Sequence, residues 1–263
     1  MGVVKHFPLR MAWNNFADTP SLITANSQVS SLPTTFLQNQ QIGKPFRSLA
    51  IAGLTIDMNF GTAQGVQLFA LRKHNISLSG VTITLSGATN AAFSPTAVSV
   101  GITPAADILL FDWGGTAQTY QYWRLEIEDP SNTDAFIELG YMFLGEFDEF
   151  DFPNNNTAIS RVDPATKRTN FDGSFVAFTK TKFRRIDFAI SPTQQVDRRR
   201  LETIYDEVGI NKGLFVFLDA NNNRDTDGYH RMTVFGTFTG EFKVNHMAID
   251  WHNVDSLVFE EIR

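Results

Sequence analysis

The chain of 263 residues contains no cysteine. A disulfide framework, a thiolate zinc site and a cysteine nucleophile are therefore excluded, and stability has to come from packing. The sequence also lacks any stretch close to the roughly 20 continuous apolar residues that a membrane helix requires. Its first residues have no apolar core of the kind found in signal peptides. We therefore expect no membrane insertion.

Basic residues are in deficit. The chain has 22 Lys and Arg against 28 Asp and Glu, a formal net charge of -6. Proteins that bind the phosphate backbone concentrate Lys and Arg, so we expect no nucleic-acid partner. Residues 1–150 contain 7 basic and 12 acidic residues, which leaves 15 and 16 for the remainder. This uneven distribution allows a charge-complementary contact between domains or between copies of the chain.

Motifs for catalysis and for cofactors are absent. The five histidines do not form the His-Glu-x-x-His pattern, and there is neither a Gly-x-Ser-x-Gly elbow nor a phosphate-cradling loop. A glycosidase needs two carboxylates that face each other across a cleft. Glu126 and Glu128 instead lie on the same face of one predicted strand, which is typical of a solvated or interface surface. We therefore predict that the protein is not an enzyme and holds no cofactor.

One segment carries oxygen ligands at alternating positions. These residues are Asp219, Asn221, Asn223, Asp225 and Asp227. A calcium-binding EF-hand loop has the same alternation, but it needs a glycine at position six and a bidentate glutamate at position twelve. Here these positions hold Arg224 and His230, and strands are expected on both sides. We interpret the segment as a polar turn, with a weak calcium site as the alternative, and we predict no metal site.

Aromatic residues are abundant, with 24 Phe and 4 Trp. Within Gln121–Asp129, every second residue from Trp123 to Ile127 is apolar, and the residues between them are charged. This alternation is the pattern of a half-buried strand. A second apolar strand is predicted at Leu139–Glu146. It is bracketed by Gly140 and Gly145, which predicts tight bends or close backbone approach at both positions.

The fold class follows from the repetition of such strands. From Leu49 to about 150 they are separated by polar or glycine-containing turns, as in an antiparallel β-sandwich or jelly roll. The second half predicts strands and one helix. The helix is expected to begin with Ser191 as its cap and Pro192 in its first turn, and to end at Gly209. We therefore predict a mainly β protein, a sandwich followed by a smaller α+β domain with one helix on a sheet.

Four segments are predicted. Residues 1–48 are rich in Asn, Ser, Thr, Gln and Pro and are interpreted as an extended N-terminal arm. Residues 49–150 form the sandwich, residues 151–160 a linker, and residues 161–263 the α+β domain. In an assembly the arm could reach a neighbouring copy.

Three aromatic residues fall in predicted loops or in the arm, and two interpretations remain open for them. Trp13, Trp113 and Tyr120 could stack on a glycan or fill a pocket of a partner protein. Alternatively, Trp113 and Tyr120 close the end of the sandwich, while Trp13 pins the arm to its own domain.

Two of the segments resemble a known family. Gln121–Asp129 followed by Phe136–Gly145 resembles the late strands of discoidin-like (galactose-binding-like) jelly rolls. The segment Leu71–Gly80 is similar to a form found in structural proteins of tailed bacteriophages, where a His-Asn turn joins two strands of such a roll. Together these motifs cover roughly residues 49–147. The ending at Val254–Glu261 is similar to the closing domain of minor tail and baseplate proteins.

The resemblance implies a structural component of the phage tail tip or baseplate, similar to distal tail proteins. Such a protein belongs to the virion, is assembled in the host cytoplasm and acts as a homo-oligomer with other tail proteins as partners. The alternative hypothesis is a carbohydrate-binding module that attaches the particle to a glycan on the host surface. The resemblance places no catalytic residue.

Overall fold

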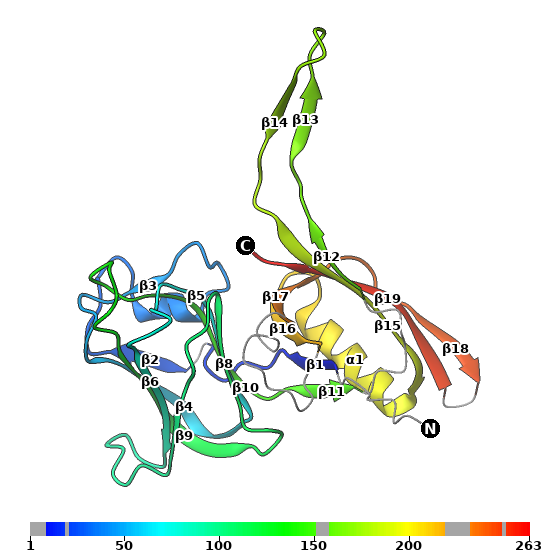
Figure 1. The fold of residues 1–263 in the computed structure, drawn as a ribbon. Coiled ribbons are helices and arrows are strands. Elements are labelled where there is room, and N and C mark those ends of the chain that lie inside the picture. Colours follow the sequence, from blue (N-terminus) through cyan, green and yellow to red (C-terminus); the bar gives the residue numbers. More distant parts are fainter. Residues whose placement is uncertain (1–8, 19–20, 151–157, 219–231, 249–250) are drawn as a thin grey trace, which may run out of the picture. The chain divides into compact units, whose positions relative to one another are not determined.

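The computed structural model describes residues 9–18, 21–150, 158–218, 232–248 and 251–263. It contains two compact units (Figure 1). We call Arg10–Glu149 the sandwich unit, and Phe150–Leu218 together with Val234–Arg263 the helix unit. Antiparallel strands dominate both units, and the described residues contain a single α-helix, so the predicted fold class is confirmed. No helix in these ranges is long and apolar enough to cross a membrane.

The sandwich unit consists of two antiparallel sheets that enclose one apolar core. The five-stranded sheet has the order β2 (Leu22–Ala25), β4 (Leu54–Val66), β9 (Gln118–Glu128), β6 (Thr82–Ala88) and β7 (Val98–Gly101). The four-stranded sheet has the order β3 (Phe46–Arg47), β10 (Glu138–Gly145), β5 (Leu68–His74) and β8 (Ile108–Asp112). The short strands β1 (Leu9–Ala12) and β11 (Asp148–Phe150) lie where the chain passes from one unit to the other.

Strand β9 lies at the centre of the five-stranded sheet and pairs with β4 and β6. Trp123, Leu125 and Ile127 are all fully buried, while the glutamates between and after them are exposed. Successive side chains of a strand point to opposite faces, so one face of β9 meets the core and the other meets solvent. The half-buried strand predicted from the alternation is confirmed.

The N-terminal segment differs from the extended arm that the sequence predicts. Residues Leu22–Ala25 pair with β4, and Thr34–Gln38 form a 3-10 helix, η1. Leu37 and Phe46 are fully buried in the sandwich core. The segment is polar and has few apolar residues, but Leu37 and Phe46 both pack into the core. The described part of residues 1–48 therefore belongs largely to the sandwich.

Asn15 fastens the start of the sandwich unit to β10. Its side-chain oxygen accepts a hydrogen bond from the Leu144 amide at 2.9 Å, and its side-chain nitrogen donates to the Met142 carbonyl at 2.8 Å. A bridge also joins Asn15 to Gly145. A Cβ at Gly145 would overlap the carbonyl oxygen of Asn14, so the close backbone approach predicted at this glycine is confirmed.

The helix unit is built on one antiparallel sheet. Its strands follow the order β16 (Leu214–Phe217), β17 (Thr233–Phe238), β19 (Trp251–Glu261), β15 (Phe183–Gln194) and β12 (Ala158–Val162), and β18 (Val244–Ala248) also pairs with β19. Helix α1 (Gln195–Val208) packs on β15 and β19 through a stripe of buried residues (Figure 1). The stripe consists of Leu201, Ile204 and Val208.

The end of α1 agrees with the prediction, but its beginning does not. Gly209 follows the helix with a φ of 53°, the left-handed conformation that glycine adopts readily after a helix. The segment from Ser191 to Gln194 is not the predicted helix cap, because it continues β15 and pairs with β19. Pro192 lies within a register shift of this pairing, where a missing amide hydrogen is tolerated.

A buried carboxylate lies at the C-terminal end of β19, an interior strand of this sheet. The side chain of Glu261 has no exposed surface. It accepts hydrogen bonds at 2.8 Å from the Arg184 side chain, from the Arg184 backbone amide and from the Arg263 side chain. Burial raises the pKa of Glu261, but these hydrogen bonds and the charge of Arg184 outweigh burial and leave the pKa below its ordinary value.

This carboxylate makes the helix unit sensitive to acid. Because the folded-state pKa of Glu261 is depressed, its contribution is present above the unfolded pKa of about 4.3 and is lost as the pH falls through the folded pKa. We expect Glu261→Gln to lower the free energy of unfolding by about 1.5–3 kcal/mol at pH 7. Urea unfolding from pH 3 to 7 tests this. Parallel pH profiles for the variant and the wild type would contradict the assignment.

Candidate functional site

An exposed hairpin is the most unusual feature of the helix unit. Strands β13 (Thr166–Thr169) and β14 (Phe175–Phe178) continue the ribbon of β12 and β15 and project beyond the sheet of their own unit (Figure 1). All eight residues of the two strands are exposed. A two-stranded hairpin without a packed face is marginally stable in water. The hairpin therefore lacks the apolar support that normally keeps two strands together.

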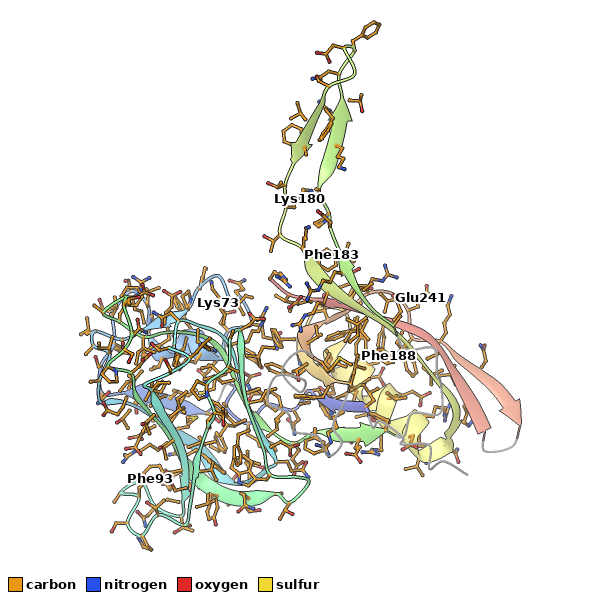
Figure 2. All side chains as sticks on the ribbon, viewed as in Figure 1. Lys73, Phe93, Lys180, Phe183, Phe188 and Glu241 are labelled. Atoms are coloured by element: carbon orange, nitrogen blue, oxygen red, sulfur yellow. The ribbon has the colours of Figure 1, made fainter. Side chains whose placement is uncertain are left out.

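Large apolar side chains lie on this hairpin. Phe171 at the tip is fully exposed, and the exposed fractions of Phe175 and Phe178 are 66% and 54%. Figure 2 draws these strands with side chains on both faces and no other element of the helix unit packed on them. Phe175 and Phe178 are three positions apart, so they point to opposite faces of the ribbon. Apolar surface is therefore presented on both sides.

The hairpin is also locally well built. At its turn, Asn170 accepts a hydrogen bond from the Gly173 amide at 3.1 Å, and the Ser174 carbonyl accepts one from the Asn170 amide at 2.7 Å. Gly173 has a φ of 82°, which glycine adopts without strain. At the base, Lys182 and Asp163 form an ion pair at 3.2 Å. The turn residues thus hold the Phe171 side chain at the tip.

The hairpin and the sandwich unit carry opposite charge. Residues 164–182 contain four basic residues and one acidic residue. Residues 10–149 contain six basic and twelve acidic residues. A cationic apolar ribbon and an acidic unit within the same chain are electrostatically complementary. This favours contact between the hairpin of one copy and another copy of the chain.

Trp113 and Tyr120, two of the predicted site residues, lie together at one end of the sandwich. The Trp113 ring meets the Trp123 ring edge-on with centroids 5.5 Å apart, and the Tyr120 ring meets it edge-on at 5.9 Å. Phe111 packs on Trp113 at 4.9 Å. All of them contact the sandwich core and are at most half-exposed. Their position is that of residues that close the end of the sandwich.

Trp13, the third predicted residue, lies elsewhere. Its indole nitrogen donates a hydrogen bond to the Asp148 carboxylate at 2.9 Å, and its ring is half-buried. It borders a pocket of about 250 Å³ whose lining lies entirely within the sandwich unit. The lining residues are Trp13, Asn14, Gln67, Glu146, Phe147 and Asp148. Trp13 takes no part in the ring contacts that join Trp113 and Tyr120 to Trp123.

The proposed calcium segment from Asp219 to Asp227 lies outside the described residues. Among the residues that the structure does describe, no group of three or more His, Asp or Glu side chains is placed to hold a metal ion. The alternation of oxygen ligands therefore remains a feature of the sequence.

The sequence interpretation missed the hairpin and most of the pocket. The sequence predicts strands in this half of the chain, but alternation of side chains does not tell a packed strand from an exposed one. The flanking basic residues Lys167, Arg168, Lys180 and Lys182 were the available signal, since a buried strand seldom has so many charges at its ends. Nothing in the sequence brings Asn14 next to Glu146, which are 132 positions apart.

Comparison with known proteins gives likeness of fold only. No family model and no curated protein matches the chain. Chitosan-binding module 1 of a chitosanase/glucanase from Paenibacillus sp. IK-5 is 16% identical, with 51% of this chain and 99% of that chain covered and a TM-score of 0.42. The family 32 carbohydrate-binding module from C. perfringens NanJ, solved with galactose, is 9% identical (53% and 99% covered, TM-score 0.41). A fucose-binding module from Streptococcus pneumoniae is 10% identical (50% and 94% covered, TM-score 0.40). At such values no ligand is assigned from the likeness.

Proposed function

We propose that this chain is a structural protein that acts by oligomeric assembly, with the β13–β14 hairpin as its main contact. The observation that carries the proposal is the exposure of Phe171, Phe175 and Phe178 on a ribbon with no packed face. Large apolar groups that gather on one exposed element mark protein interaction sites. The well-formed turn indicates that the hairpin is built to be presented to a partner.

The two-sided exposure defines the kind of contact. Phe175 lies on one face of the ribbon, while Val176 and Phe178 lie on the other, so a partner on one face would leave apolar surface uncovered on the other. A ribbon held between two surfaces would bury both. Because each copy offers the same hairpin to the next copy, such contacts are heterologous and can close into a ring.

We place this assembly in the tail tip or baseplate of a tailed bacteriophage. What supports the placement is the resemblance of Leu71–Gly80 and Val254–Glu261 to segments of phage tail and baseplate proteins. The partners are then other tail proteins and further copies of the chain, the protein belongs to the virion, and it is assembled in the host cytoplasm.

The mass of the full chain in solution tests the assembly. We expect light scattering across a concentration series to show a defined higher oligomer, and negative-stain images of that species to show a closed ring. The oligomer should persist in moderate salt, because apolar burial is not screened as surface charge is. A strict monomer at every concentration would contradict self-assembly through the hairpin.

Carbohydrate binding is a second candidate function. The observation that favours it is the pocket beside Trp13, in which an aromatic ring and several polar side chains converge. Sites for small ligands use a few polar groups that converge on the ligand and fix its orientation. Two of the structurally similar modules are named for chitosan and fucose, and a third was solved with galactose, but for this chain the pocket is the reason for the proposal.

A further inference from the structure

The aromatic side of the Trp13 pocket is held in place by its neighbours. The hydrogen bond from the indole nitrogen to Asp148 fixes the orientation of the ring. The backbone that follows Trp13 is fastened to β10 by the hydrogen bonds of Asn15 to Met142 and Leu144. A ring that is oriented before the ligand arrives loses little conformational entropy on binding. The orientation of the Trp13 ring at the pocket is therefore fixed before a ligand arrives.

Other side chains in the pocket are structural. Gln67 accepts a hydrogen bond from the Phe147 amide at 3.3 Å and donates one to the Gly115 carbonyl at 3.0 Å, so both ends of its amide group are engaged. The guanidinium group of Arg10 lies 4.4 Å from the centre of the Phe147 ring. These contacts shape the walls of the pocket.

Two polar side chains at the pocket remain available. Glu146 and Asn14 are exposed and line the pocket, and within the described ranges neither side chain makes a hydrogen bond or an ion pair. The carboxylate of Glu146 can accept hydrogen bonds from an ammonium or hydroxyl group, and the amide of Asn14 can both donate and accept. The pocket thus combines an oriented aromatic ring with two uncommitted hydrogen-bonding groups.

The charge of the pocket is negative. Glu146 and Asp148 are the charged residues of its lining, and both are acidic. Arg10, the cation that contacts a lining residue, forms ion pairs with Asp112 at 2.5 Å and with Glu149 at 2.6 Å. Its charge is therefore balanced by carboxylates outside the pocket. A cationic ligand is favoured over a neutral one, and an anionic ligand is disfavoured.

We propose that this pocket binds a sugar with a protonated amino group, such as a glucosamine unit of an oligosaccharide. The sugar ring stacks on Trp13, the ammonium group pairs with Glu146, and Asn14 bonds to a ring hydroxyl. The pocket volume of about 250 Å³ lies below the range of about 300–1,000 Å³ typical of drug-sized ligands, which suits a single sugar ring. The inference rests on the second candidate function and is independent of assembly.

Titration of the full chain with three trisaccharides tests the proposal. The probes are the glucosamine trimer, its fully N-acetylated counterpart, which carries no charge, and cellotriose, which has a hydroxyl group in place of each amine. Isothermal titration calorimetry at pH 6 and low salt gives Kd for each. We expect the glucosamine trimer to bind at least tenfold more tightly than either neutral sugar, and the preference to shrink when salt is added.

Two variants make the test specific. Glu146→Gln should reduce the preference for the amino sugar at least fivefold, and the exposed position of Glu146 means that the fold should be kept. Glu128→Gln is the matched control, since Glu128 is an exposed glutamate on β9 that does not line the pocket. Trp13→Leu should weaken the binding of all sugars together, because it removes the stacking surface.

Several outcomes would overturn the inference. The first two are the absence of saturable binding by any trisaccharide and equal binding of the charged and neutral sugars. The third is an equal loss of the preference for the amino sugar in Glu128→Gln. The fourth is equally tight binding of putrescine, which has charge without a sugar ring. Light scattering of the same samples separates this proposal from the assembly. A chain that forms its oligomer but binds no amino sugar refutes only the pocket, and a monomer that binds the sugar refutes only the assembly.

Discussion

Replacing Phe175 and Phe178 together by serine is expected to abolish assembly while the chain remains folded. Burying a phenylalanine contributes about 1.5–3 kcal/mol, so losing two from one contact costs about 3–6 kcal/mol. This corresponds to a rise in Kd of roughly 10²- to 10⁴-fold. Both side chains are exposed and belong to β14, a strand with no buried residue, so their loss should leave no cavity. Light scattering would show the change as a shift from oligomer to monomer.

The control for this variant removes the same kind of surface elsewhere. Leu49 and Leu78 are exposed apolar residues of the sandwich unit, with exposed fractions of 69% and 63%. Leu49→Ser combined with Leu78→Ser should leave the mass of the oligomer unchanged. If this control disrupts assembly as strongly as the hairpin variant, exposed apolar residues support assembly wherever they lie. The hairpin would then not be the main contact.

Trp123→Ala is expected to destabilise the sandwich unit by about 3–5 kcal/mol, the usual range for truncating a buried tryptophan. Trp123 is fully buried at the centre of the sheet. The rings of Trp113 and Tyr120 both pack on it. Its loss removes the core contact of the aromatic cluster as well as its own buried surface. A loss of this size is a large part of the 5–15 kcal/mol that typically separates folded from unfolded domains.

Hydrogen exchange read by mass spectrometry can assign this loss to one unit. Two units need not unfold in one step, so a single midpoint would not locate the effect. We expect faster exchange throughout β4, β6 and β9, with the helix unit unchanged. Tyr122→Ala changes the adjacent, half-buried residue on the opposite face of β9 and should cost clearly less. Equal effects of the two substitutions would contradict the inward orientation of Trp123.

Several elements could be predicted because their cause is local. The alternation around Trp123 predicts a strand with one buried face, and the structure has that strand at the centre of a sheet. Gly209 ends the helix by a conformation that depends on the residue itself. Gly145 marks a close approach because a side chain there would displace a backbone. In each case one residue type has a conformation or a size that few others share.

Other elements were mispredicted because the deciding partner is distant in sequence. Pro192 has the chemistry of a first helical residue, yet pairing with β19 keeps its segment in a strand. The polar segment before residue 48 reads as an arm because its apolar residues are sparse, and yet Leu37 and Phe46 reach the core. Tertiary contacts overrode local preference at both places, as they often do where propensities are weak.

The sequence by itself determined the class of the fold, the inward face of β9, the stop of the helix and the absence of a disulfide framework, since these depend on periodicity, single-residue conformation and composition. Only the tertiary structure decided which aromatic residues are exposed and available for contact with a ligand or a partner. It places Trp113 and Tyr120 against Trp123, sets Trp13 at a pocket with Glu146, and leaves Phe175 and Phe178 uncovered. The physical reason is that exposure depends on what packs against a side chain, and the residues that pack there come from strands far apart along the chain.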